Sequence, residues 1–577
     1  MRLHTSDIRS ATRRQPGRQP LGRHRGGARR GRGQLPARGT ALGAAMLVGA
    51  ASLVVPRAGA SAAALPVASG NPLLAPFESQ TVRWQECQVG PNDAVGGYLD
   101  NVGAQCADVS VPLDYARPTG RTITLGLARI RAVDQAHRRG PLMVNLGGPG
   151  GGAVDAVADI RAMLGPTADR FDLVAMDPRF VGRSSALDCG PALGADWLRA
   201  AGPDQDSFER VAAEQAATAA GCSAHADVLP FASTRNTARD MDVVRAALGA
   251  ATTSYLGYSY GTYLGAVYMQ MFPDRVDRFV LDSAVDPATY SPRVLRGSGD
   301  LLEAALGEWA AWAAGQDAQF ALGRTAAQVL HTVDRIYQAA ARRPLTVDGV
   351  RYDASDIPRL LIASLIDDSE DAAAVLAMGV RAFADAADGR APAANPYLTE
   401  FLQGLATDGP ALPGAHAHAG TDAGAGGSVV SAFQSAQLAV LCGDVPASRI
   451  AGDYLADVRR HTGAQRHVAG AIWNITPCAF WPVRPVEPPT RVANAVPALV
   501  VAAEKDNRTP YAGARALHRV LSASRLVTLR DARVHGVYPG RSGCVDGAVN
   551  AYLQNGTSPR GDVTCTSPPA AVGSPPE

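Results

Sequence analysis

Short apolar runs separated by amphipathic stretches recur through the first half of the chain. Residues 122–131 alternate apolar and polar side chains, which is typical of a half-buried strand. Shorter runs are almost continuously apolar, as expected of strands covered on both faces; they span 141–146, 171–176, 254–258 and 276–281. Between these runs, residues 234–248 and 261–272 follow a helical pattern. This alternation predicts an α/β protein with a mostly parallel central sheet and helices on both faces.

The pattern becomes mostly helical from about residue 291 to residue 484, and strand-like runs resume at 498–503 and 525–529. We therefore expect a helical cap, 291–484, inserted between two parts of one core, 81–290 and 485–566. The Ala-, Gly- and His-rich stretch 409–427 predicts a mobile loop within the cap. Outside these domains, we expect a flexible segment over 61–80 and a disordered, proline-rich tail over 567–577.

Residues 1–60 have the features of an export signal. A basic region reaches Arg38, an apolar stretch runs from about 41 to 55, and the small residues Ala58-Gly59-Ala60 precede Ser61. The alternative is a membrane anchor, but the apolar stretch is short of the roughly 20 residues that a span needs. We expect a secreted protein without stable membrane association, exported by either the general or the twin-arginine route.

The net charge of +2 hides an uneven distribution, because the excess of basic residues lies at the N-terminus. Residues 1–60 hold twelve arginines and a single acid, so the remainder of the chain carries a net charge of −9. An acidic body gives no electrostatic reason to expect nucleic acid or anionic lipid as a partner. The sequence does not indicate an oligomeric state.

All eight cysteines follow the expected signal, and an even count in an exported protein predicts disulfides. Pairing of sequence neighbours is one of the 105 possible connectivities. It would join Cys87 to Cys106, Cys189 to Cys222, Cys442 to Cys478 and Cys544 to Cys565. Free buried thiols are the alternative. Because no CxxC or HxxxH spacing occurs, we expect no metal site.

The strongest chemical signal is Gly257-Tyr258-Ser259-Tyr260-Gly261, a G-x-S-x-G motif directly after a strand and directly before a helix. Such a turn crowds the backbone, so its flanking positions need glycine, and it presents the serine as a nucleophile. The backbone N–H of Tyr260 then faces a developing oxyanion. An ordinary glycine-rich turn is the alternative, and the strand-helix context argues against it.

A glycine-rich loop, Gly147-Gly148-Pro149-Gly150-Gly151-Gly152, follows the strand 141–146. Glycines let backbone N–H groups approach a substrate oxygen closely, and Gly148 is our preferred second oxyanion donor, with Gly147 next. Neither a G-x-G-x-x-G nor a GKS/GKT motif is present, so phosphate binding is the weaker interpretation. We expect no cofactor.

A serine nucleophile needs a base, and the base needs an acid to orient it. Asp506 follows the strand 498–503 and His535 follows the strand 525–529, in the chain order that this motif requires. We predict that Asp506 is the acid and His535 the base. Other candidates exist; the acids are Asp282, Asp286 and Asp531, and the histidines are His416, His418 and His518.

These blocks together resemble the secreted tripeptidyl aminopeptidase-like branch of the prolyl aminopeptidase family of α/β-hydrolases. The resemblance covers most of 84–565. It rests on the two glycine motifs, on the segments around Asp506 and His535, and on four further blocks: Met176-Asp177-Pro178-Arg179 with Gly182-Arg183-Ser184, 280–287, Cys442-Gly443-Asp444, and Pro477-Cys478 with Trp481-Pro482. It implies the α/β-hydrolase fold with a helical cap, and a serine exopeptidase that hydrolyses peptides from their N-terminus.

The resemblance carries over Ser259, Asp506 and His535 as the catalytic triad. It also implies that Asp177 and Arg179 support the oxyanion loop and that Thr509 holds the acid loop. An exopeptidase also needs an acidic side chain that binds the N-terminal ammonium group of the substrate. Asp444 and Glu308 are candidates for this role. The chain departs from the family where Phe180 replaces a usual glycine, where Gly152-Ala153 replaces Ser-Gly, and where cap cysteines are missing after the 309–312 region.

Two other functions fit the same residues. A secreted carboxylesterase would use the same triad, and an apolar pocket instead of an acidic one would favour it. A non-catalytic binding module would retain the fold, but the presence of all three triad residues and of the glycine loop argues against that function. Because fold does not determine substrate, the reaction class is predicted more directly than the specificity.

Overall fold

The computed structural model describes residues 71–190, 198–393, 399 and 426–567. The expected signal, the tail from 568 and the histidines at 416 and 418 lie outside the described residues. Within the expected flexible segment, residues 75–78 form helix α1 (Ala75–Glu78), and the Gln80 side chain donates to the Ser110 carbonyl at 2.9 Å. This part of the segment is therefore anchored to the core.

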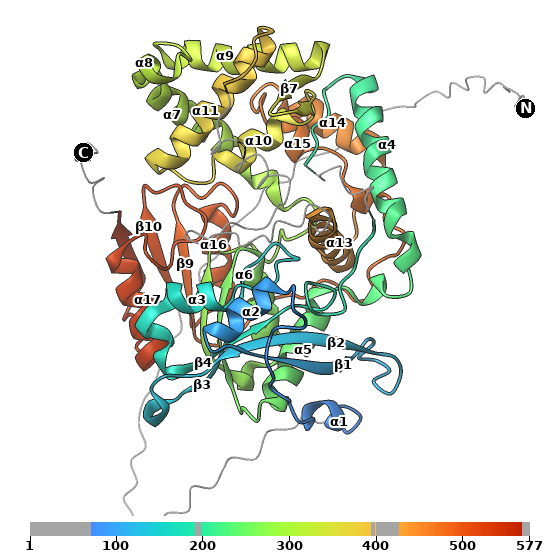
Figure 1. The fold of residues 1–577 in the computed structure, drawn as a ribbon, viewed down its shortest axis with the longest axis vertical. Helices are drawn as coiled ribbons and strands as arrows, with labels where there is room; N and C mark the ends of the chain where they lie inside the picture. Colours follow the sequence, from blue (N-terminus) through green and yellow to red (C-terminus); the bar gives the residue numbers. More distant parts are fainter. Residues whose placement is uncertain (1–70, 191–197, 394–398, 400–425, 568–577) are drawn as a thin grey trace, which may run out of the picture. The chain divides into compact units, whose positions relative to one another are not determined.

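One large sheet organises the described chain (Figure 1). Its strand order is β1-β2-β4-β3-β5-β6-β9-β10-β11. The strands are β1 (Gln105–Pro112), β2 (Thr122–Ile130), β3 (Gly140–Asn145), β4 (Phe171–Met176), β5 (Thr253–Tyr258), β6 (Val276–Asp282), β9 (Ala498–Ala503), β10 (Arg525–Arg530) and β11 (Val563–Thr566). Strand β2 is antiparallel to both β1 and β4, and all other neighbours are parallel. The predicted mostly parallel sheet is confirmed.

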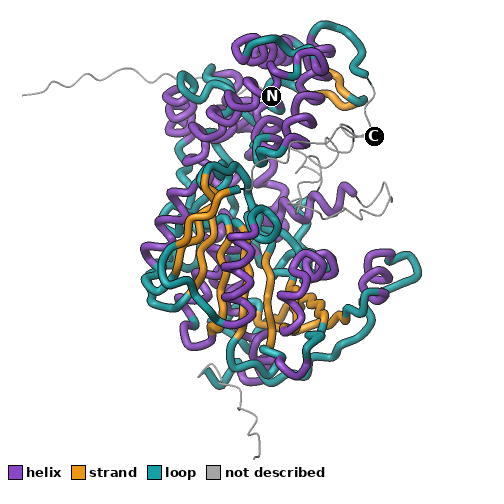
Figure 2. The backbone as a smooth tube through the Cα atoms, turned by 90° about the vertical axis from the view of Figure 1, so that its left-hand side faces the viewer, coloured by secondary structure: helices purple, strands orange, loops and turns teal. Residues whose placement is uncertain are grey.

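Helices cover both faces of this sheet, and Figure 2 shows them alongside the strands. Side chains of α3 (Val157–Leu164) and α17 (Gly543–Asn555) join one apolar cluster with Leu142 and Val144 of β3. Side chains of α5 (Thr234–Ala247), α6 (Tyr260–Met271) and α16 (Tyr511–Val520) join the other cluster with Met143. Alternation along a strand explains why consecutive residues of β3 belong to opposite clusters.

In its described residues, the segment expected to form the cap is mostly helical, and it also contains the hairpin of β7 (Leu345–Val347) and β8 (Val350–Tyr352). Helices α7 (Gly299–Gly315), α9 (Ala326–Arg342), α10 (Ile357–Ser364) and α11 (Glu370–Ala387) share an apolar cluster of their own. Helix α13 (Gly426–Asp444) differs, because its residues Leu438, Val440 and Leu441 belong to the cluster of the sheet. Tyr454, Leu455 and Ile475 belong to a third, smaller cluster, so the described residues of 291–484 are divided among two separate clusters and the core.

All four disulfides join the predicted sequence neighbours, Cys87–Cys106, Cys189–Cys222, Cys442–Cys478 and Cys544–Cys565. The Cys442–Cys478 bond connects α13 to the short helix η8 (Pro477–Ala479), and Cys544–Cys565 connects α17 to edge strand β11. No described helix combines the length and the apolar character that crossing a bilayer would require.

Candidate active site

Ser259 occupies the sharp turn between β5 and α6. Its φ of 55° lies in the left-handed region, which a residue with a side chain adopts only at a cost. The turn is crowded, because a Cβ on Gly257 would lie 2.6 Å from the Gly261 carbonyl oxygen and a Cβ on Gly261 would lie 2.8 Å from that of Asn145. Glycine is therefore required on both sides, and the strained turn holds the partly exposed Ser259 at the carboxyl edge of the sheet.

The glycine loop after β3 lies directly against this turn. A Cβ on Gly147 would be 3.1 Å from the Cβ of Ser259 and 2.7 Å from the Tyr258 carbonyl oxygen. Gly147, Gly148 and Gly150 have φ angles of 96°, 106° and 101°, which favour glycine. The backbone that carries the proposed oxyanion donor Gly148 is thus adjacent to the proposed nucleophile.

Buried Asp177 anchors the end of this loop. Its Oδ1 accepts from the N–H groups of Ala153 and Val154 at 2.7 and 3.0 Å, and its Oδ2 accepts from Arg183 N–H at 2.8 Å. Burial raises the pKa of Asp177 to about 6, although the three backbone donors oppose that effect. The expected support by Arg179 takes another form, since that guanidinium pairs with Asp240 of α5 at 2.7 Å.

The unusual Phe180 has a φ of 68°, in the left-handed region that favours glycine. The ring is 3% exposed and belongs to the core cluster of α5 and α6. A left-handed residue with a side chain costs roughly 1–2 kcal/mol, and burial of a phenylalanine ring stabilises by about 1.5–3 kcal/mol. Packing of the ring therefore offsets the cost of the left-handed backbone at this position.

Asp506 and His535 are hydrogen-bonded to each other. His535 Nδ1 lies 2.9 Å from Asp506 Oδ2, with the carboxylate fully buried and the imidazole 17% exposed. The Thr509 hydroxyl donates to the same oxygen at 2.8 Å, and the Thr509 N–H donates to Oδ1 at 3.1 Å. A carboxylate that accepts from Nδ1 fixes the ring tautomer in which Nε2 is free to act as a base.

The charge of Asp506 is stabilised by the same contacts. Burial alone would raise the pKa of this carboxyl. The charge and hydrogen bond of His535, together with the N–H groups of Arg508 and Thr509, outweigh burial and hold the pKa of Asp506 below its ordinary value. Asp506 is therefore ionised at neutral pH and able to stabilise an imidazolium.

Asp282, an alternative acid, ends β6 and is bonded to the loop that follows His535. Its carboxylate accepts from the N–H groups of Val537 at 3.0 Å and Tyr538 at 2.7 Å, and its carbonyl accepts from Ser259 N–H at 3.0 Å. Burial raises the pKa of Asp282 to about 6. The residue thus connects the loop of the proposed base to the nucleophile turn.

The remaining candidates have other partners. Asp286 accepts from Ala288 N–H at 2.9 Å within its own loop. Asp531 is exposed, and its N–H donates to Glu504 at 3.0 Å. His518 contacts Ser524 at 2.7 Å and Asp562 at 3.3 Å. In the described parts of the chain, no group of three His, Cys, Asp or Glu side chains is arranged to hold a metal ion.

The two acids proposed for substrate ammonium lie in different surroundings. Glu308 is 48% exposed and lines a cavity together with Trp309, Trp312 and Arg533. Its carboxylate is 3.1 Å from Lys505 Nζ, next to Asp506, so the cavity adjoins the loop of the proposed acid. Asp444 is buried at the end of α13 and is hydrogen-bonded to Thr234, which gives it a different environment.

Two features of the site were missed from sequence. Helix α13 packs on the glycine loop, where a Cβ on Gly150 would lie 2.7 Å from the Phe433 carbonyl oxygen. The carbonyl of Leu365, in the turn after α10, accepts from Asn507 at 2.6 Å and from Arg533 at 3.3 Å. The turn after α10 is therefore hydrogen-bonded to the loop that carries Asp506 and to the loop that carries His535. The small residues of the glycine loop are the only sequence signal for the contact with α13. No local pattern indicates the hydrogen bonds to the Leu365 carbonyl.

Comparison with known proteins identifies relatives along most of the chain. A family model described as "alpha/beta hydrolase fold" matches residues 140–349, and one described as "TAP-like protein" matches 466–565. The chain is 35% identical over 481 residues to a tripeptidyl aminopeptidase of Streptomyces lividans, covering 80% of this chain and 83% of that one. It is 30% identical over 514 residues to the serine protease Hip1 of Mycobacterium tuberculosis, covering 85% and 92%. It is also 32% identical over 522 residues to a carboxylesterase B of the same species, covering 86% and 91%.

Proposed function

Because the chain belongs to the tripeptidyl aminopeptidase-like branch of the α/β-hydrolase family, we propose that it is a secreted serine exopeptidase that releases short peptides from the N-terminus of its substrates. Ser259 is the nucleophile, His535 the base and Asp506 the acid. The observation that carries this proposal is the 2.9 Å contact between His535 Nδ1 and Asp506 Oδ2, at the sheet edge where the Ser259 turn also lies.

The proposed reaction is acyl transfer through a covalent intermediate. His535 takes the Ser259 proton as the hydroxyl oxygen attacks the peptide carbonyl, and the N–H groups of Tyr260 and Gly148 stabilise the oxyanion. The C–N bond then breaks, and His535 gives the proton to the leaving amine. Water attacks the acyl-enzyme, again with His535 as base, and releases the N-terminal fragment and Ser259.

Specificity for the N-terminus is assigned to the cavity of Glu308. Trp309 and Trp312 line the same cavity, and the Glu308 carboxylate lies 3.1 Å from Lys505 Nζ and 3.6 Å from the Arg533 guanidinium, in the loops of Asp506 and His535. Carboxylates and aromatic faces both attract ammonium groups. Further acids line the same cavity: Asp367, Asp368 and Glu370. We assign the substrate ammonium to this cavity, which makes peptides with a free N-terminus the substrates.

Substitution Glu308→Gln is expected to raise KM for peptides with a free N-terminus by about tenfold, with kcat nearly unchanged, because uniform binding energy is lost. The same variant should leave the kinetics of an uncharged ester substrate unaltered. The measurement is steady-state kinetics on both substrates, with Glu86→Gln, an exposed glutamate outside the cavity lining, as the matched control. Unchanged KM for the peptide would remove Glu308 from substrate binding.

Secretion is part of the proposal. Four disulfides within the described residues are typical of proteins that mature in an oxidising compartment. The apolar stretch 41–55, followed by Ala58-Gly59-Ala60, supplies the expected signal and cleavage site. Export would place the enzyme among extracellular peptides, in agreement with the proposed substrates.

Digestion of an unblocked decapeptide, followed by mass spectrometry, tests the proposal. We expect an N-terminal tripeptide as the first product, and the remaining heptapeptide as its partner. A short-chain nitrophenyl ester serves as the parallel substrate, because the similarity to a carboxylesterase B favours an esterase as the second candidate. Ester cleavage without any peptide cleavage would establish the esterase instead.

A further inference from the structure

Asp444 is a buried acid that the proposed mechanism does not use. It is 6% exposed and ends helix α13. One residue binds both of its carboxylate oxygens: Thr234 N–H donates to Oδ1 at 2.7 Å, and the Thr234 hydroxyl donates to Oδ2 at 2.5 Å. Thr234 is the first residue of α5, so this contact connects α13 to a helix of the core.

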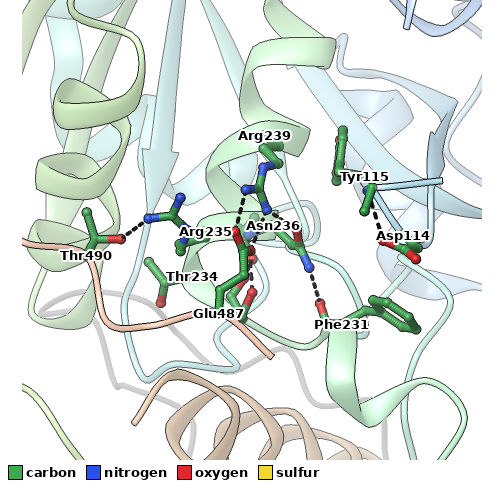
Figure 3. A network of polar contacts seen from close by, with 12 residues as sticks. Asp114, Tyr115, Phe231, Thr234, Arg235, Asn236, Arg239, Glu487 and Thr490 are labelled. Atoms are coloured by element: carbon green, nitrogen blue, oxygen red, sulfur yellow. Dashed lines mark hydrogen bonds and ion pairs between the residues drawn. The ribbon is translucent and has the colours of Figure 1, made fainter. Parts of the chain in front are cut away.

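The carboxylate of Asp444 has no cationic partner among the described residues. The neighbouring Arg235 has other partners, since its Nε lies 3.0 Å from Glu487 and its Nη1 3.1 Å from Thr490. Figure 3 shows Arg235 between these two residues. Arg239 is also bound to Glu487, at 2.7 Å. Both arginines of this network are thus engaged elsewhere, and Asp444 is held by hydrogen bonds alone.

A chain of hydrogen bonds continues from Asp444 to the nucleophile turn. The Tyr260 hydroxyl lies 2.7 Å from Thr234 Oγ1. Because Thr234 uses its proton for Asp444, its oxygen accepts from Tyr260, so the order is Tyr260 to Thr234 to Asp444. Tyr260 directly follows Ser259, and its backbone N–H is the first proposed oxyanion donor. Buried Tyr290 packs beside it, with ring centroids 6.0 Å apart.

The other part of α13 covers the second proposed donor. A Cβ on Gly148 would lie 3.5 Å from the Phe433 ring, and a Cβ on Gly150 would lie 3.1 Å from the Gln437 backbone nitrogen. A disulfide at Cys442 fixes the helix end close to Asp444. One helix therefore contacts the glycine loop and is also fastened, through Asp444, to the side chain of Tyr260.

We propose that Asp444 is a positioning residue of the oxyanion hole, which sets the relative placement of the Tyr260 and Gly148 backbone amides through Thr234 and helix α13. This inference rests on the proposed roles of Ser259, Tyr260 and Gly148. Donors of an oxyanion hole contribute to the transition state and little to substrate binding. Asp444 therefore acts on kcat and leaves KM almost unchanged.

The decisive variants are Asp444→Asn, Thr234→Val and Thr234→Ser. Asp444→Asn and Thr234→Val should each lower kcat by about tenfold to a hundredfold, because the amides lose their fixed geometry. This loss is smaller than that expected from deleting an oxyanion donor, and KM should stay within about twofold of the wild-type value. Thr234→Ser keeps the hydroxyl and the N–H, so it should retain most of the wild-type kcat. Asp206→Asn, an exposed acid in the first turn of α4 (Gln205–Gly221), is the matched control for the charge change.

Stability separates positioning from a merely structural role. Burial raises the pKa of Asp444 to about 7, against the hydrogen bonds from Thr234. A folded pKa above the unfolded value means that the wild type loses stability as pH rises from about 4 to about 7. The groups that face this carboxyl are Thr234, Tyr260, Tyr263, Tyr290 and Glu487. The asparagine of Asp444→Asn does not titrate, so this variant does not lose stability in the same way. The difference between the Tm of the variant and the Tm of the wild type should therefore increase from pH 5 to pH 8.

The expected result is a variant with lower kcat and undiminished Tm at pH 8. An unchanged kcat in Asp444→Asn and Thr234→Val would overturn the inference. So would a fall in kcat accompanied by a comparable fall in Tm, or an equal fall in kcat in Thr234→Ser. Kinetics are measured on a tripeptide anilide and on a nitrophenyl ester. If the wild type cleaves only the ester, the peptidase proposal fails, but the ester still tests Asp444.

Discussion

Replacement of Ser259 by alanine is expected to lower kcat by at least about 10⁴-fold on every substrate that the enzyme cleaves, since the residual rate comes only from binding and the oxyanion hole. The reason is the turn itself, which has a φ of 55° at Ser259 and the glycine loop packed against its Cβ. The measurement is the rate of chromogenic amine release, with circular dichroism to show that the fold is retained.

Ser223→Ala, at an exposed serine on a short helix of the core, is the matched control and should be fully active. A fluorophosphonate, which forms a covalent bond with an activated serine and releases fluoride, provides an independent readout. It should label the wild type and the control but not Ser259→Ala. Substantial hydrolysis by Ser259→Ala would show that another residue is the nucleophile.

The second large effect is expected for Asp506→Asn, which should lower kcat by about 10⁴-fold. The introduced amide would offer an NH₂ group to His535 Nδ1 in place of an acceptor, which selects the wrong ring tautomer. The hydrogen bonds from Arg508 and Thr509 hold the side chain in the same place, so little change in structure is expected. The rate is measured over a range of pH together with the unfolding midpoint.

Asp282→Asn is the informative comparison, because Asp282 was the rival acid in the sequence. The carboxylate of Asp282 accepts from the backbone of Val537 and Tyr538, and asparagine keeps one acceptor oxygen for those donors. The expected loss of kcat is therefore about tenfold or less. If Asp282→Asn lowers kcat more than Asp506→Asn does, then Asp282, at the end of β6, is the acid of the triad.

Much of the sheet could be predicted from the alternation and length of the apolar runs. Seven strands match their expected positions to within a residue or so at each end. The edge strands β1 and β11 were missed. Strand β1 alternates only over 108–111, where Val109 and Val111 are buried and Asp108 and Ser110 are exposed, and this stretch is too short to stand out in the sequence. Strand β11 has four residues, of which only Cys565 is buried, so it is too short to give a periodic pattern.

The sequence indicates those parts of the candidate site that belong to a local motif, and it gives no sign of the contacts that depend on packing. The crowding of Gly257 and Gly261 follows from their own turn, and the common sheet edge of Ser259, Asp506 and His535 follows from the parallel strands that precede them. The placement of α13 over the glycine loop depends on contacts between residues that are far apart in the sequence. The environment of Asp444 has the same origin, because its hydrogen bonds to Thr234 join residues that are 210 positions apart in the sequence.

The most direct test of the central claim compares a tripeptide anilide that has a free N-terminus with its N-acetylated form, for the wild type and for Ser259→Ala. An aminopeptidase that binds a charged N-terminus should show a kcat/KM at least about 100-fold higher on the free peptide, because acetylation leaves an acidic pocket without its cation. That activity should disappear in Ser259→Ala. Equal rates on the two peptides, or activity that survives the substitution, would contradict the proposed function.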